Sequence, residues 1–236
     1  MAGAKKLVTG ASGFLGSHVT RQLVDRGDDV RVLIRTTSST KAIEDLNVDY
    51  HYGDIFDDAA VRTAMAGCDD VFCCDVDPRA WLRDPAPLFR TNVDGLRHVL
   101  DAAVDADLMR FVFTSTIGTI GIPAERRAAP EEDEFNWADK GGAYVVSRVE
   151  AENLVMRYGE ERGPPAVLCV SNTYGPRDWQ PTLDHGKAER ELGWQPGPVH
   201  DPRRRAAQFF RENRRRSRRR GRKQVAHYAC PQRVPA

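Results

Sequence analysis

The chain has 236 residues, of which 41% are hydrophobic and 29% charged, and its formal net charge is +1. These proportions are typical of a folded globular protein and exclude disorder along the whole chain, and no apolar run is as long as a membrane span. The small net charge conceals an asymmetry. Residues 201–236 hold thirteen Lys and Arg against two acidic residues, a local charge of +11 that leaves −10 on residues 1–200.

The first expected element is a strand over residues 5–8, followed directly by the glycine-rich sequence TGASGFLG at residues 9–16. Apolar residues then recur at helical spacing until Arg26. A glycine turn between a strand and a helix lets main-chain N–H groups and the positive helix end approach a pyrophosphate, and side chains on the glycines would obstruct that approach. The pattern predicts a dinucleotide site, and a βα turn that binds nothing is the alternative. The residues expected to contact the cofactor here are Gly10, Ser12, Gly13, Phe14, Leu15 and Gly16.

The second expected strand covers residues 29–34, and the residue at its end is the one that distinguishes NAD from NADP. Enzymes that use NAD place Asp or Glu at this point, about 20 residues past the glycines, whereas this chain has Arg35. Lys41 follows, with five hydroxyl residues between the two cations. Two cations with hydroxyl donors suit a 2′-phosphate, so NADP(H) is the expected cofactor and NAD(H) the second choice. A solvated basic loop is the alternative.

Further strands are expected over residues 48–52, 70–74, 110–114 and 166–171, with helices over residues 88–103 and 144–158 among the connections. Alternating strands and helices predict an α/β fold with a doubly wound, Rossmann-like parallel sheet. The ligand edge of such a sheet lies at the carboxyl ends of its strands.

Thr116 follows the fifth expected strand and Tyr144 leads a helix, so the two hydroxyls can converge at that edge. Thr116 could hold a substrate carbonyl while the Tyr144 phenol passes a proton to its oxygen as hydride arrives. Simple packing is the alternative for each residue taken alone.

The motifs together resemble the extended short-chain dehydrogenase/reductases, the NAD-dependent epimerase/dehydratase superfamily. The branch in question holds dihydroflavonol reductases, cinnamoyl-CoA reductases and 3β-hydroxysteroid dehydrogenases. The resemblance runs from residue 5 to about residue 181, and SNTYGP at residues 171–176 is similar to the family's turn after the sixth strand. It implies a catalytic set of Thr116, Tyr144, Arg148 and Asn92. Beyond the glycine turn it implies cofactor contacts from Arg35, Lys41, Asp54, Ile55, Thr114, Tyr144, Arg148 and Asn172.

Three departures from the family pattern are visible. Arg148 stands where the family has a catalytic lysine; it can supply a positive field but cannot release a proton near neutrality. The signature KAERELGWQP at residues 187–196 follows almost directly on residue 181, so most of the substrate lobe is expected to be missing. Asp75 replaces a small neutral residue beside the cofactor, and we expect its carboxylate to point away from the phosphates. Weakened chemistry is the consequence.

We therefore expect a dinucleotide-binding domain over residues 1–181, the remnant of a C-terminal substrate lobe over 182–213 and a basic, disordered tail over 214–236. The expected function is an NADP(H)-dependent oxidoreductase acting on a small-molecule carbonyl or secondary alcohol. A catalytically degraded nucleotide-binding or interaction protein is the alternative. A cytoplasmic location and a homodimer through the helices carrying Asn92 and Tyr144 are further expectations. The five cysteines lack zinc spacing and are expected to be reduced, with no metal site, and nucleic acid is not an expected partner.

Overall fold

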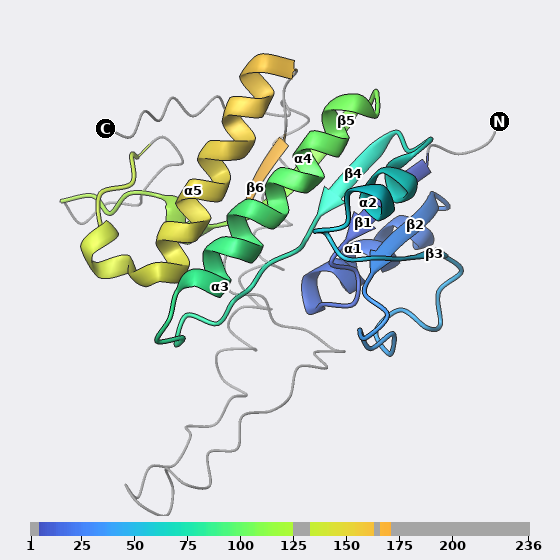
Figure 1. The fold of residues 1–236 in the computed structure, drawn as a ribbon, viewed down its shortest axis with the longest axis horizontal. Coiled ribbons are helices and arrows are strands. Elements are labelled where there is room, and N and C mark those ends of the chain that lie inside the picture. Colours follow the sequence, from blue (N-terminus) through green and yellow to red (C-terminus); the bar gives the residue numbers. More distant parts are fainter. Residues whose placement is uncertain (1–4, 125–132, 163–165, 171–236) are drawn as a thin grey trace, which may run out of the picture. The chain divides into compact units, whose positions relative to one another are not determined.

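The computed structural model describes residues 5–124, 133–162 and 166–170. Within them, six parallel strands form one sheet in the order β3-β2-β1-β4-β5-β6, which confirms the expected doubly wound α/β fold (Figure 1). The lobe remnant and the basic tail expected after residue 181 lie outside the described residues. The strands are β1 Lys5–Thr9, β2 Asp29–Ile34, β3 Asp49–Tyr52, β4 Asp70–Cys73, β5 Arg110–Thr116 and β6 Ala166–Val170.

The strand order reverses between β1 and β4. The chain runs outward from β1 through β2 to β3 and then returns to add β4 on the other side of β1, in a register that pairs Thr9 with Cys73. In doubly wound sheets, ligands bind in the crevice outside the carboxyl ends of the strands at this switch point. The glycine turn directly after β1 therefore stands at the place where a ligand is expected.

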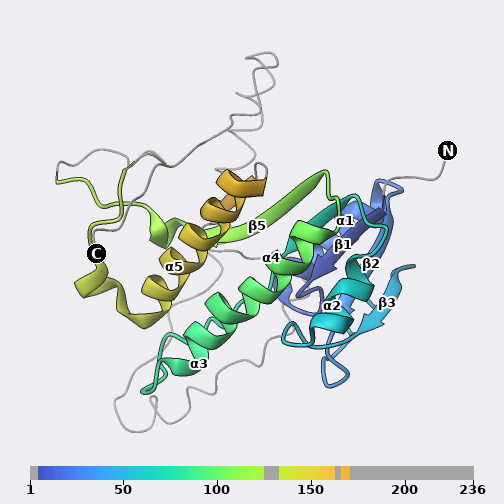
Figure 2. The ribbon, with the colours of Figure 1, turned by 45° about the horizontal axis from the view of Figure 1, so that its top comes forward.

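Seven helical segments connect the described strands. The single helix expected over residues 88–103 is divided into three of these segments. A six-residue π-helical segment, η1, separates α3 from α4. Both ribbon views show α4 and α5 side by side (Figures 1 and 2). Gly142, with φ +70° and ψ 171°, breaks α5, so the part that carries Tyr144 begins just after this kink. The segments are α1 Phe14–Asp25, α2 Asp58–Met65, α3 Ala86–Phe89, η1 Arg90–Gly95, α4 Leu96–Asp105, the 3₁₀ turn η2 Ile117–Thr119 and α5 Ala138–Arg162.

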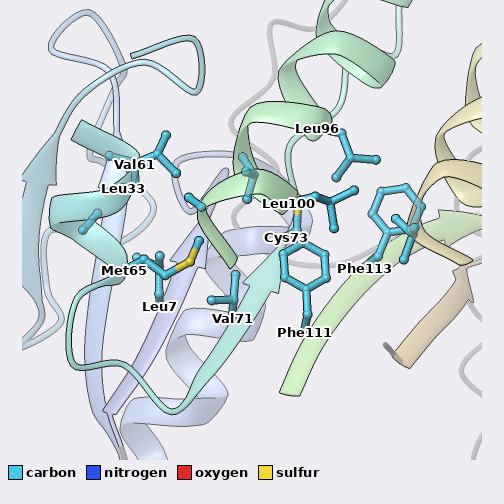
Figure 3. Packing of buried hydrophobic residues seen from close by; sticks show 14 of the residues in the cluster. Leu7, Leu33, Val61, Met65, Val71, Cys73, Leu96, Leu100, Phe111 and Phe113 are labelled. Carbon is cyan, nitrogen blue, oxygen red and sulfur yellow. The ribbon is translucent and has the colours of Figure 1, made fainter. Parts of the chain in front are cut away.

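The two faces of the sheet carry separate apolar cores, because successive side chains of a strand point to opposite faces. Leu7 and Cys73 pack with α2, α4 and α5 on one face, where Phe111 and Phe113 also lie (Figure 3). Val8 and Cys74 pack with α1 on the other. These continuous apolar strands are what a parallel sheet covered on both sides requires.

The described cysteines agree with the expectation of reduced thiols. Cys68, Cys73 and Cys74 are free and buried, and burial raises the pKa of Cys73 to about 12. No helix in the described ranges is both long and apolar enough to cross a bilayer.

Candidate active site

The glycine turn after β1 is shaped by contacts between main-chain atoms. Gly10 has φ +68°, and a Cβ on it would lie 2.7 Å from the carbonyl carbon of Cys74. A Cβ on Gly16 would lie 2.3 Å from the Gly10 carbonyl oxygen. Both distances are too short for any side chain, so Gly10 and Gly16 are required by the packing of the turn itself. The expectation that the three glycines also clear a path for the ligand stays a prediction.

Gly13 is the glycine that leaves room for a ligand. It is exposed, and the nearest atom to a Cβ there is the Gly10 oxygen at 3.3 Å. Gly13 is also the N-cap of α1, whose N-terminus has no side-chain cap and no acidic residue in its first turn. A helix N-terminus carries partial positive charge from its unpaired N–H groups, which stabilises a bound phosphate. The turn therefore presents an uncompensated donor surface beside an open approach.

The residues expected to contact the adenosine half follow the neighbouring strands. Arg35 and Lys41 lie in the exposed segment after β2, where the Ser38 amide donates to the Arg35 carbonyl over 2.9 Å. Asp54 follows β3, and its Oδ1 accepts from the Phe56 amide at 3.1 Å. Because β3, β2 and β1 are adjacent, these groups share one sheet edge with the glycine turn. Ile55, by contrast, packs against the apolar core beneath α4.

Thr116 and Tyr144 lie on adjoining elements. Thr116 ends β5 and caps η2, its Oγ1 accepting from the Gly118 amide at 3.2 Å. A Cβ on Gly118 would lie 3.6 Å from both Thr116 Oγ1 and a methyl group of Val145, the residue after Tyr144. Both Thr116 and Tyr144 are partly exposed. The convergence of the Thr116 and Tyr144 hydroxyls on a single substrate oxygen stays a prediction.

Asn92 connects three elements through its side chain. Its Oδ1 accepts from the Asp77 amide at 2.7 Å, and its Nδ2 donates to the Asp77 carbonyl at 3.2 Å and to Ser147 Oγ at 3.0 Å. Ser147 in turn donates to the Tyr144 carbonyl at 2.7 Å. Asn92 is 1% exposed and lies in the π-helical segment. These bonds tie the loop after β4 to the first turn of the helix that carries Tyr144.

Arg148 is buried, with 2% exposure. Its Nη2 donates to the Thr114 carbonyl, its guanidinium carbon lies 4.7 Å from the centroid of the Phe113 ring, and Nε and Nη1 have no partner among the described residues. Burial lowers the pKa of Arg148, while Tyr144, Cys73 and Glu152 raise it. The hydrogen bond and the ring contact of the guanidinium are both made with β5.

Thr114 is occupied within the protein. Its Oγ1 donates to the Cys73 carbonyl at 3.0 Å, and its own carbonyl accepts from Arg148. The expected cofactor contact of Thr114 therefore has no free hydroxyl hydrogen in this structure. Asn172 and the whole 171–176 turn lie outside the described residues.

Sequence reasoning missed Ser147 as a part of the site. Ser147 could have been found only from its position three residues after Tyr144 on the helix. One carboxylate oxygen of Asp75 is shielded from solvent, and the expectation that this carboxylate points away from the phosphates stays a prediction. Among the described residues, no three His, Cys, Asp or Glu side chains are grouped so as to hold a metal ion.

Comparison with known proteins places these features in one family. The model of the NAD dependent epimerase/dehydratase family matches residues 6–190. A dihydroflavonol 4-reductase of Dianthus caryophyllus is 30% identical over 68% of this chain and 51% of its own length. The crystal structure of gox2253 superposes with a TM-score of 0.70 and 33% identity, covering 77% of this chain and 56% of that one.

A third similarity concerns a solved complex. The UDP-glucose 4-epimerase of Thermus thermophilus, determined with NAD, superposes with a TM-score of 0.65 and 28% identity over 82% of this chain and 64% of its own. The chain spans about half the length of the curated relatives it matches. About half of each of these relatives therefore has no matching segment in the given chain.

Proposed function

The chain belongs to the NAD-dependent epimerase/dehydratase family, and from this premise we propose that it binds NADP(H) and interconverts a carbonyl group and a secondary alcohol. The observation that carries the proposal is the turn after β1. Gly10 and Gly16 close it without side chains, and Gly13 leaves the uncapped end of α1 open to a diphosphate. Bound there, a nicotinamide dinucleotide supplies or accepts the hydride.

The protein's own part in the reaction falls to two hydroxyl groups. Thr116 Oγ1 orients the substrate oxygen, and the Tyr144 phenol gives that oxygen a proton in reduction or takes one in oxidation. Arg148 stands in for the family's lysine as a source of positive field near Tyr144, and Asn92 with Ser147 holds the start of that helix in place. Arg148 does not relay a proton, because a guanidinium stays protonated near neutrality.

The preference for the phosphorylated cofactor depends on Arg35 and Lys41. Both are exposed in the segment that follows β2, the strand next to β1 and its glycine turn, where a 2′-phosphate could pair with them. NAD(H) is the second choice, supported by the epimerase relative solved with NAD.

A nucleotide-binding protein without turnover is the second candidate function. It is favoured by the buried Arg148, whose guanidinium is bonded to β5. A missing substrate lobe would leave the reacting groups open to water and remove the binding energy that orients a substrate.

Titration of the purified full chain with NADPH and NADH, followed by single-turnover assays on steroid and flavonoid ketones, separates the two candidates. Tyr144→Phe should abolish hydride transfer and preserve NADPH affinity. Tyr158→Phe, on the same helix with its hydroxyl bonded to Asp101, is the matched control and should behave as the unmodified protein. Turnover in Tyr144→Phe equal to that of the control would contradict the acid/base role. Binding of NADPH with no hydride transfer in the unmodified protein would favour the second candidate.

Two further variants address the cations. Arg35→Ala should weaken NADPH more than NADH, and Arg110→Ala, an exposed arginine at the start of β5, should change neither. Arg148→Lys should raise the single-turnover rate, a result that unchanged kinetics would contradict. The homodimer and the cytoplasmic location stay predictions; sedimentation with and without NADPH tests the first.

A further inference from the structure

Asp75 lies at the switch point of the sheet, two residues beyond the end of β4. β4 pairs with β1 up to Thr9 and Cys73, and a Cβ on Gly10 would lie 2.9 Å from the Asp75 amide nitrogen. The main chain of Asp75 is therefore packed against the first glycine of the turn. A dinucleotide whose diphosphate lies on that turn must pass beside this residue.

Two polar atoms at this place have no partner within the described chain. Asp75 Oδ2 and Oγ1 of Thr9, a residue with 0% exposure, are shielded from solvent and form no hydrogen bond of good geometry, although the Thr9 hydroxyl is close enough to the Asp75 carboxylate to lower its pKa. Buried polar atoms without partners are rare in folded proteins, because each one loses its hydrogen bonds to water without replacement. This pair of atoms is therefore incompletely hydrogen-bonded within the described chain.

Charged and titratable groups that belong to or follow three strands are close enough to the Asp75 carboxylate to affect its charge. Arg35 follows β2, Asp54 follows β3, and the thiols of Cys73 and Cys74 belong to β4 and its end. Burial raises the pKa of Asp75 to about 6, the nearby Thr9 hydroxyl and Arg35 lower it, and Asp54 raises it. At neutral pH the carboxylate is therefore mostly ionised. It then competes with a bound anion for the positive charge of Arg35.

We infer that Asp75 is a specificity-determining residue of this site, whose ionised carboxylate opposes the 2′-phosphate of NADP(H) beside the guanidinium that would receive that phosphate. The inference rests on the coenzyme site proposed above. Arg35 attracts the phosphate and Asp75 reduces that attraction, because like charges at one site disfavour each other.

Protonation of Asp75 removes the opposition. The neutral carboxyl group adds no charge and offers an O–H donor to an adjacent phosphate oxygen. Binding of NADPH near pH 7 therefore takes up a proton at Asp75, and discrimination in favour of the phosphorylated cofactor is stronger when Asp75 is neutral. Its effect on NADH is smaller, since that cofactor has the diphosphate but no 2′-phosphate.

The test compares dissociation constants of NADPH and NADH for the unmodified full chain and for Asp75→Asn between pH 5 and pH 8. At pH 8 the substitution should tighten NADPH about tenfold, equivalent to about 1.4 kcal/mol, and NADH about threefold or less. At pH 5 the ratio of the two proteins' constants for NADPH should approach one. Taking this ratio for a single ligand cancels the titration of the 2′-phosphate itself. The matched control is Asp107→Asn, an exposed aspartate before β5 at the opposite edge, which should leave both cofactors unaffected.

A second measurement needs no variant. Calorimetric titration of the unmodified protein with NADPH at pH 7, repeated in two buffers of different ionisation enthalpy, should show a net uptake of protons on binding. Equal tightening of both cofactors in Asp75→Asn, a ratio that stays constant with pH, or no proton uptake would each overturn the inference while leaving the coenzyme site intact. Failure of both proteins to bind either cofactor would overturn the coenzyme site and the inference with it.

Discussion

Asp75→Asn should change how the stability of the ligand-free protein depends on pH. Burial raises the pKa of Asp75 from its ordinary value of 3.8 to about 6. A group with a raised pKa in the folded state binds its proton more tightly there than in the unfolded chain. Its contribution is therefore fully present below about pH 4 and is lost as the pH rises through about 6.

The size of the effect follows from the shift. Two pKa units at 1.36 kcal/mol each correspond to about 3 kcal/mol of stability lost between about pH 4 and pH 7. Asparagine has nearly the same shape and does not ionise, so the variant escapes this loss. The free energy of unfolding of Asp75→Asn, minus that of the unmodified protein, should thus grow by about 3 kcal/mol over this interval.

Urea unfolding followed by circular dichroism at pH 4, 5, 6, 7 and 8 measures this difference. Other titrating groups are common to both proteins and cancel. Asp107→Asn, which removes an exposed carboxylate, is the matched control. A difference for Asp75→Asn that stays constant within about 0.5 kcal/mol, well below the shift expected for a buried carboxyl, would refute the burial of its charge.

Three other predictions concern packing and can be measured by the same unfolding experiment. Gly16→Ala should lower the free energy of unfolding by about 3 kcal/mol, since its Cβ would lie 2.3 Å from the Gly10 oxygen. Gly13→Ala should retain the stability of the fold and lose affinity for the cofactor. Equal stability of the two variants would contradict the different roles of these glycines. Asn92→Ala removes three buried hydrogen bonds and should cost about 3 kcal/mol; a cost below about 1 kcal/mol would show that the linkage is weak. Arg148→Met should be neutral or stabilise by up to about 2 kcal/mol, because two nitrogens of the buried guanidinium are unpaired. A large loss in that variant would mean that the charge is better compensated than the structure shows.

The strands were predictable because a buried parallel sheet needs short, continuous apolar runs, and these runs are visible in the sequence. Residues 29–34 were expected as a strand, and β2 spans Asp29–Ile34. The helix over residues 88–103 was only partly predictable. Its apolar spacing indicates a helix, but the π-helical segment Arg90–Gly95 depends on contacts such as those of Asn92 with the loop after β4, and local spacing does not encode them.

The site was predictable in its residue types and less so in what those residues contact. The glycine spacing indicated the turn, but it did not separate Gly13 from the two glycines that the protein's own packing requires. Motif spacing placed Arg148 one helical turn after Tyr144. It could not show that the guanidinium is bonded to the Thr114 carbonyl, because that contact joins residues 34 positions apart.

By itself the sequence determined the order of strands and helices, the glycine turn after the first strand and the hydroxyl groups that the later motifs carry, since each of these is written in local spacing and residue type. Only the tertiary structure decided which groups meet. It places Asp75 against the glycine turn beside Thr9, and it closes the hydrogen bonds from Asn92 to Ser147. The physical reason is that burial and hydrogen bonding arise where segments distant in the sequence pack together. The pKa of a carboxylate or a guanidinium is shifted only by that environment.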